Sequence, residues 1–151
     1  MAHCGLVEVP REVVELPNLH ILDVGRNHLR SLPDHFASSR MRELRLCRNQ
    51  LQALPASVAK CQELVEIDLA WNCLNAFPEC VVSLPMIERL FLQHNLIPKL
   101  PKSVSHLSLR GEDLTELSLE YNQLQAINHV AVHCRELYLG HNPLRTLDGF
   151  K

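Results

Sequence analysis

Six asparagines recur along the 151-residue chain, each inside a segment of the form L-x-x-L-x-L-x-x-N-x-L. They are Asn27, Asn49, Asn72, Asn95, Asn122 and Asn142. Their spacings are 22, 23, 23, 27 and 20 residues. A period of roughly 20 to 50 residues is typical of chains built from stacked structural units. This period therefore constrains the fold more than any other feature of the sequence.

Each segment combines a strand pattern with a turn. In Leu44-Arg45-Leu46 the leucines alternate with a variable residue, which is the period of a strand with one buried face. One such strand is too short to bury its leucines alone, so we expect successive strands to stack as a parallel sheet with a shared core. The asparagine follows where the chain turns. Its amide can donate to and accept from buried backbone groups, each of which costs about 1 to 3 kcal/mol if left unpaired.

An apolar residue followed by proline comes after each of the first four asparagines. These pairs are Leu32-Pro33, Leu54-Pro55, Phe77-Pro78 and Leu100-Pro101. We expect the apolar residue to point into the core and the proline to start a return segment on the convex side. The pattern lengthens over residues 101–113, where Val104-x-x-Leu107-x-Leu109 resembles the start of a strand. We interpret this stretch as an inserted convex-side loop or a degenerate register.

The repeats predict a single array over residues 1–151. We place a half repeat at residues 1–18 and six repeats starting near residues 19, 41, 64, 87, 114 and 134, with the last one truncated. Cys4 then occupies the asparagine position of the half repeat. Because the array starts and stops inside a repeat, either short irregular segments cover its ends or it is a piece of a longer array, which we favour. Exposed end leucines then predict self-association.

Composition excludes several classes of function. The net charge of −2 gives no electrostatic case for nucleic acid binding. No apolar run approaches the roughly 18 residues that cross a bilayer, and the amino terminus lacks the apolar stretch of a secretory signal, so we expect no membrane insertion. The six cysteines show no C-x-x-C spacing. This favours reduced thiols and a cytoplasmic protein.

Three positions of each repeat are expected to face out of the concave sheet, because the leucines are committed to the core. The first column is Ile21, Glu43, Glu66, Arg89, Glu116 and Glu136. The second column is Asp23, Arg45, Asp68, Phe91, Ser118 and Tyr138. The third column, just before the asparagines, is Arg26, Arg48, Trp71, His94, Tyr121 and His141. Six strands about 4.8 Å apart make a surface about 24 Å across.

Aromatic residues gather on these columns. The single Trp, both Tyr and one of the four Phe lie there, and Trp, Tyr and Arg anchor many protein interfaces. We predict an apolar centre of Trp71, Phe91, Tyr121 and Tyr138, with arginines at its amino-terminal side and Glu43, Glu66, Glu116 and Glu136 along one edge. The predicted protein-binding residues are Arg26, Arg45, Arg48, Trp71, Phe91, His94, Tyr121, Tyr138 and His141.

Cross-strand packing alone is the alternative explanation for these columns. Arg45 between Asp23 and Asp68 would then belong to a salt-bridge ladder, which contributes little at a surface. His94 and His141 lie two strands apart, about 9 to 10 Å, which is too far for one metal ion. They are expected instead to make binding sensitive to pH near neutrality.

The sequence offers no catalytic constellation. His129-x-x-x-His133 followed by Cys134 has metal-ligand types, but it lies on an irregular segment without a second pair, so we interpret these as surface histidines. No glycine-rich phosphate loop and no activated nucleophile motif occurs. We therefore expect no metal, no cofactor and no enzymatic activity in this chain.

The runs LRLCRNQLQALP, at residues 44–55, and IDLAWNCLNAFP, at residues 67–78, resemble the N-x-L-x-x-L-P class of intracellular leucine-rich repeats, which is about 23 residues long. The resemblance covers about residues 6–147. It implies an α/β solenoid shaped as a curved horseshoe, with a parallel β-sheet on the concave face and loops and short helical turns on the convex face.

The class occurs in Ras-pathway scaffolds, Scribble-type polarity proteins, Roco kinases and leucine-rich-repeat phosphatases. By this similarity, the chain is expected to be a non-catalytic scaffold module of intracellular signalling that binds a protein partner through its concave face. The alternative is a recognition segment of a longer signalling enzyme, a kinase, phosphatase or ubiquitin ligase, whose catalysis lies outside this chain.

Overall fold

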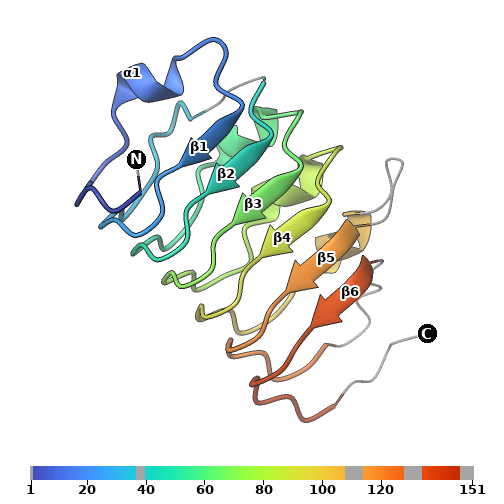
Figure 1. Cartoon of the computed structure of the whole chain (residues 1–151). Helices are drawn as coiled ribbons and strands as arrows, with labels where there is room; N and C mark the ends of the chain where they lie inside the picture. Colours follow the sequence, from blue (N-terminus) through green and yellow to red (C-terminus); the bar gives the residue numbers. More distant parts are fainter. Residues whose placement is uncertain (1, 37–39, 108–113, 128–133, 147–151) are drawn as a thin grey trace.

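The computed structural model describes residues 2–36, 40–107, 114–127 and 134–146. The chain winds as a solenoid of stacked coils, and each coil adds one strand to an open parallel sheet ordered β1-β2-β3-β4-β5-β6 (Figure 1). The strands are β1 Ile21–Asp23, β2 Glu43–Arg45, β3 Glu66–Asp68, β4 Arg89–Phe91, β5 Leu114–Ser118 and β6 Cys134–Tyr138. The sequential parallel order confirms the predicted solenoid.

Short helices lie on the side of the coils away from the sheet (Figure 1). They are the α-helix α1 Arg11–Val14 and the 3₁₀ helices η1 Ala56–Lys60, η2 Glu79–Ser83 and η3 Lys102–His106. A proline precedes each 3₁₀ helix, because its fixed φ suits the entry and its missing N–H needs no partner there. No helix in the described part of the chain has the length and apolar character of a membrane span.

The stretch around η3 decides between the two sequence-based interpretations for the described residues. Val104 is buried inside η3, at the position that Val58 holds in η1 and Val81 in η2. Residues 104–107 therefore belong to an ordinary convex-side turn, which agrees with the convex-side interpretation, and their resemblance to a strand start is misleading. A single buried valine is compatible with a strand and with a turn, because one buried residue shows no periodicity. Residues 108–113, which include Leu109, lie outside the described residues.

The core runs through the inside of the coils as one continuous cluster. Leu44 and Leu46 of the β2 segment and Leu51 after its turn are fully buried. Burying a leucine side chain stabilises a protein by about 1.5 to 3 kcal/mol, so successive repeats contribute through the same three positions. Leu137 and Leu139 near the last strand are only half-buried, although both pack against the core.

The asparagine side chains tie neighbouring coils together. Asn72 accepts a hydrogen bond from the Leu51 N–H at 3.0 Å, and its Nδ2 donates to the carbonyls of Leu46 at 3.0 Å and Leu69 at 3.1 Å. Leu46 and Leu51 belong to the preceding coil, whereas Leu69 belongs to the same coil as Asn72. The predicted double role of the asparagine amide as donor and acceptor is confirmed.

The first coil is joined to the preceding turn by the same kind of asparagine hydrogen bonds. Asn27 accepts hydrogen bonds from the backbone N–H groups of Cys4 at 3.0 Å and Leu6 at 2.9 Å. His3, just before Cys4, has a positive φ of 66°, as do the residues before the six asparagines. Cys4 therefore holds the place of an asparagine in an additional turn, as the spacing predicts.

Candidate functional site

Strand register places the first and second columns side by side across the sheet. In the first column, Ile21 pairs with Glu43, and the pairing continues through Glu66, Arg89 and Glu116 to Glu136. The second column continues in the same way from Asp23 to Tyr138. Alternate residues of a strand point to one face, so both columns project away from the core. Their alignment agrees with the predicted surface.

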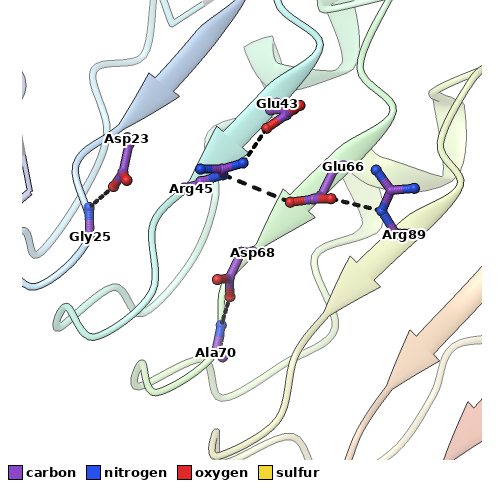
Figure 2. A network of polar contacts seen from close by, with 8 residues as sticks. All are labelled: Asp23, Gly25, Glu43, Arg45, Glu66, Asp68, Ala70 and Arg89. Atoms are coloured by element: carbon purple, nitrogen blue, oxygen red, sulfur yellow. Dashed lines mark hydrogen bonds and ion pairs between the residues drawn. The ribbon is translucent and has the colours of Figure 1, made fainter.

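Ion pairs connect the amino-terminal half of these columns (Figure 2). The Arg45 guanidinium lies 2.6 Å from the Glu43 carboxylate and 3.9 Å from that of Glu66. On the neighbouring strand, the Arg89 guanidinium lies 2.7 Å from Glu66. The chain of pairs thus runs Glu43, Arg45, Glu66, Arg89 across β2, β3 and β4. It neutralises two of the four glutamates that were predicted to form an acidic edge.

The salt-bridge ladder considered for Arg45 with Asp23 and Asp68 is wrong. Asp23 accepts a hydrogen bond from the Gly25 N–H and Asp68 one from the Ala70 N–H, each at 3.0 Å (Figure 2). Short aspartate side chains reach the backbone two residues ahead, whereas Arg45 needs the longer glutamates. Burial raises the pKa of Asp68, although the bond from Ala70 opposes the shift.

The third column lies in the turns and not in the strands, which corrects the sequence-based placement. All six of its residues have φ between 53° and 58°, in the left-handed region. Each follows the end of its strand by a few residues. Such a conformation costs roughly 1 to 2 kcal/mol for a residue with a side chain. It persists because the asparagine that follows bonds the backbone of the same turn.

The rings of the third column form a continuous stack. The centroids of Trp71 and His94 are 3.6 Å apart, and those of His94 and Tyr121 are 4.2 Å apart. Tyr121 and His141 follow at 4.0 Å, and every interplanar angle is 15° or less. The Arg48 guanidinium lies 5.0 Å from the Trp71 ring and covers its other side. We call these five residues the ring row.

The structure therefore divides the predicted apolar centre into two parts. Trp71 and Tyr121 belong to the ring row, whereas Phe91 and Tyr138 stand in the second column on β4 and β6. In the described residues, no stacking contact joins the two groups. Repeat spacing predicts which residues share a column, but it does not say which columns touch.

The arginine, histidine and aromatic residues that were predicted to bind a protein all lie on the second and third columns. Arg26 is exposed at the turn before Arg48, and Arg45 is engaged with glutamates. The ring of Tyr121 lies between His94 and His141. His129 and His133 lie outside the described residues, and Cys134 of β6 packs against the core.

The carboxy-terminal half of the second column contains a buried serine, Ser118, which is not among the predicted binding residues. Ser118 lies in register between Phe91 and Tyr138 and is 4% exposed. In the described residues its hydroxyl has no hydrogen-bond partner. The Tyr138 hydroxyl donates to Glu136 at 3.0 Å. Burial raises the pKa of Glu116, and the nearby Glu136 raises it further.

Comparisons with known proteins agree on the repeat. A family model described as leucine rich repeat matches residues 39–97. Fibromodulin of Bos taurus is 31% identical over 121 residues, which cover 66% of this chain and 32% of fibromodulin. PH domain leucine-rich repeat-containing protein phosphatase 1 of Homo sapiens is 30% identical over 122 residues, which cover 76% of this chain and 7% of that protein. The chain thus spans a third or less of these relatives.

Solved structures show the same fold. A leucine-rich-repeat protein of Leptospira interrogans is 27% identical with a TM-score of 0.85, covering 94% of this chain and 36% of that protein. An internalin of Listeria monocytogenes is 20% identical with a TM-score of 0.75, covering 92% of this chain and 40% of the internalin.

Proposed function

Because the chain is a leucine-rich-repeat protein, we propose that it is a non-catalytic scaffold module of intracellular signalling that binds a protein partner through its concave face. One observation carries this proposal: large aromatic side chains remain exposed on the strand and turn columns. Trp71, Tyr121 and Tyr138 are 47%, 44% and 42% exposed. Such side chains bury large areas in interfaces at modest entropic cost.

The ring row suits this role because it is ordered before a partner arrives. Each ring stacks on the next one in the row, and stacked aromatic pairs contribute about 0.5 to 1.5 kcal/mol beyond their buried area. A partner then contacts the outer edges of the rings and loses little binding energy to side-chain ordering. Arg48 at one end of the row adds a cation next to the apolar surface.

A cytoplasmic location is part of the proposal. Cys73 and Cys4 carry free, exposed thiols, and such thiols persist in a reducing compartment. Burial first, and then the nearby Asp68 carboxylate, raise the pKa of Cys47 to about 11, which suppresses its thiolate. A fluorescent fusion that localises outside the cytoplasm would contradict this part.

The test is capture of a partner from cell lysate by wild-type protein and by Trp71→Ala. We expect Trp71→Ala to lose the partner and to keep the far-UV circular-dichroism spectrum. Leu96→Ala is the matched control, because Leu96 is also 47% exposed but belongs to none of the three columns. It should capture the partner as wild type does. Retained capture by Trp71→Ala contradicts the proposal, and loss of the spectrum shows that Trp71 is structural.

A second candidate function is a recognition segment of a longer signalling enzyme. The observation that favours it is the similarity to the phosphatase, because a repeat segment like this one occupies only 7% of that much larger protein. A kinase, phosphatase or ubiquitin-ligase domain would then be encoded beside this segment. Determining the complete open reading frame separates the two functions.

A further inference from the structure

The second column lacks a ring at one position between two aromatic side chains. Phe91 on β4 and Tyr138 on β6 flank Ser118 on β5 in register. Strands are about 4.8 Å apart, so the backbones of Phe91 and Tyr138 are about 10 Å apart. In the ring row, by contrast, every coil from Trp71 to His141 supplies a ring. We call the position at Ser118 the serine gap.

The serine gap contains polar groups without partners. Ser118 as a residue is 4% exposed, and its hydroxyl, which still reaches solvent, has no hydrogen bond within the described residues. Gln93, two residues beyond Phe91 on the adjacent coil, has a buried Oε1 that is also without a partner. A buried polar group left unpaired costs about 1 to 3 kcal/mol, so native proteins rarely retain one without a reason. Both groups can accept a hydrogen bond from an N–H donor.

Negative charge surrounds the serine gap. Glu116 precedes Ser118 by two residues on the same face of β5, and Glu136 on β6 lies in register with Glu116. In the described residues, none of Glu116, Glu120 and Glu136 forms an ion pair, whereas Glu43 and Glu66 are neutralised by arginines. The Tyr138 hydroxyl holds the Glu136 carboxylate beside the ring. Arg89 lies in register with Glu116 and its charge acts on that carboxylate, but Arg89 is bound to Glu66 at 2.7 Å, so the three glutamates leave an excess of negative charge here.

We propose that the serine gap binds an arginine side chain of the protein partner, with its guanidinium between Phe91 and Tyr138 and its N–H groups bonded to Glu116 and Glu136. This assignment rests on the proposed protein-binding function and specifies the chemistry of the partner. Arginine fits because its group is planar, stacks on aromatic faces and carries five donors. The Ser118 hydroxyl, which still reaches solvent, supplies a further acceptor.

The test uses the peptide acetyl-Gly-Gly-Arg-Gly-Gly-amide, titrated into ¹⁵N-labelled protein and followed by NMR chemical shifts. We expect saturable shifts centred on Phe91, Ser118 and Tyr138, with a dissociation constant on the order of 1 mM for a single side chain. The citrulline peptide, which keeps the shape and loses the charge, should give no saturable shifts. Equal binding of the citrulline or the lysine peptide would overturn the assignment.

Variants separate the serine gap from the rest of the surface. Ser118→Leu fills the gap and Glu116→Gln removes a charge, and each should weaken peptide binding at least tenfold, roughly 1.4 kcal/mol. Glu43→Gln is the matched control, because this carboxylate is already paired with Arg45, and it should bind the peptide normally. If Ser118→Leu does not fold, Glu116→Gln decides alone. Unchanged binding in Glu116→Gln overturns the proposal.

The two proposals fail in different ways. If Trp71→Ala loses the partner while the arginine peptide gives no shifts, the protein-binding function stands and the arginine site falls. If the peptide binds at Ser118 while capture does not depend on Trp71, the arginine site stands and the role assigned to Trp71 falls.

Discussion

Replacement of Asn72 by alanine tests the asparagine ladder quantitatively. The largest part of the cost comes from the Leu51 N–H, which donates to Asn72 Oδ1 at 3.0 Å in the core and has no acceptor in the variant. A buried donor left unpaired costs about 1 to 3 kcal/mol. The substitution also removes the bonds that Nδ2 donates to Leu46 at 3.0 Å and to Leu69 at 3.1 Å.

Each of those two carbonyls keeps another hydrogen bond in the variant, which limits the loss of stability. The Leu46 carbonyl keeps a bond from Asn49 at 3.0 Å, and the Leu69 carbonyl keeps one from Asn95 at 2.9 Å. Each lost bond then contributes only its net value of about 0.5 to 1.5 kcal/mol. With the unpaired N–H added, the free energy of unfolding should fall by about 2 to 6 kcal/mol. Urea unfolding followed by circular dichroism measures it.

Asn142→Ala is the internal control. Its Oδ1 accepts from the Leu124 N–H at 3.1 Å in a part-buried site, where water can replace the side chain. Its Nδ2 also donates to Leu119 at 2.8 Å and to Leu139 at 2.9 Å in part-buried sites, so the free energy of unfolding should fall by about 1 to 3 kcal/mol, without the cost of a fully buried unpaired N–H. Equal losses for the two variants, or a loss below about 1 kcal/mol for Asn72→Ala, would refute the reasoning that burial of the Leu51 N–H sets the cost.

Two further predictions concern single side chains. Cys47 has its pKa raised from 9.0 to about 11, mainly by burial, so iodoacetamide at pH 8 should alkylate the exposed Cys73 long before Cys47. Mass spectrometry of timed samples measures this, and equal rates would contradict it. Arg26 has a φ of 54°, so Arg26→Gly should be about 1 kcal/mol more stable than Arg26→Ala in urea unfolding. The reverse order would exclude a left-handed turn there.

The repeat period predicts the sheet and its columns well, because one asparagine per coil sets the register of every strand. The pairing of Ile21 with Glu43, and of each later residue with its counterpart, follows from counting. The count fails between Leu100 and Leu114, where the spacing expands and the leucines of residues 104–109 fit a strand or a turn equally well. Proline before η3 is the better guide there, since it precedes the other two 3₁₀ helices as well.

Side-chain partners were harder to predict than columns. Arg45 has aspartates on both sides in its own column, yet it pairs with Glu43 and Glu66, because the aspartates bond to the turn backbone. The stack in the third column and the serine gap also depend on where rings point. Ser118 could not be predicted as part of a site from the sequence, because a serine in a strand is informative only when the positions of the neighbouring side chains are known.

The spacing of the ring row bears on the curvature of the molecule. Its ring centroids are 3.6 to 4.2 Å apart, whereas the neighbouring strands that lead into these turns are about 4.8 Å apart. Side chains that converge in this way lie on the inner side of an arc. Straightening the solenoid would pull these rings out of contact, so stacking between Trp71 and His141 opposes straightening. The same side chains that would meet a partner therefore also hold the curve to which the partner must fit.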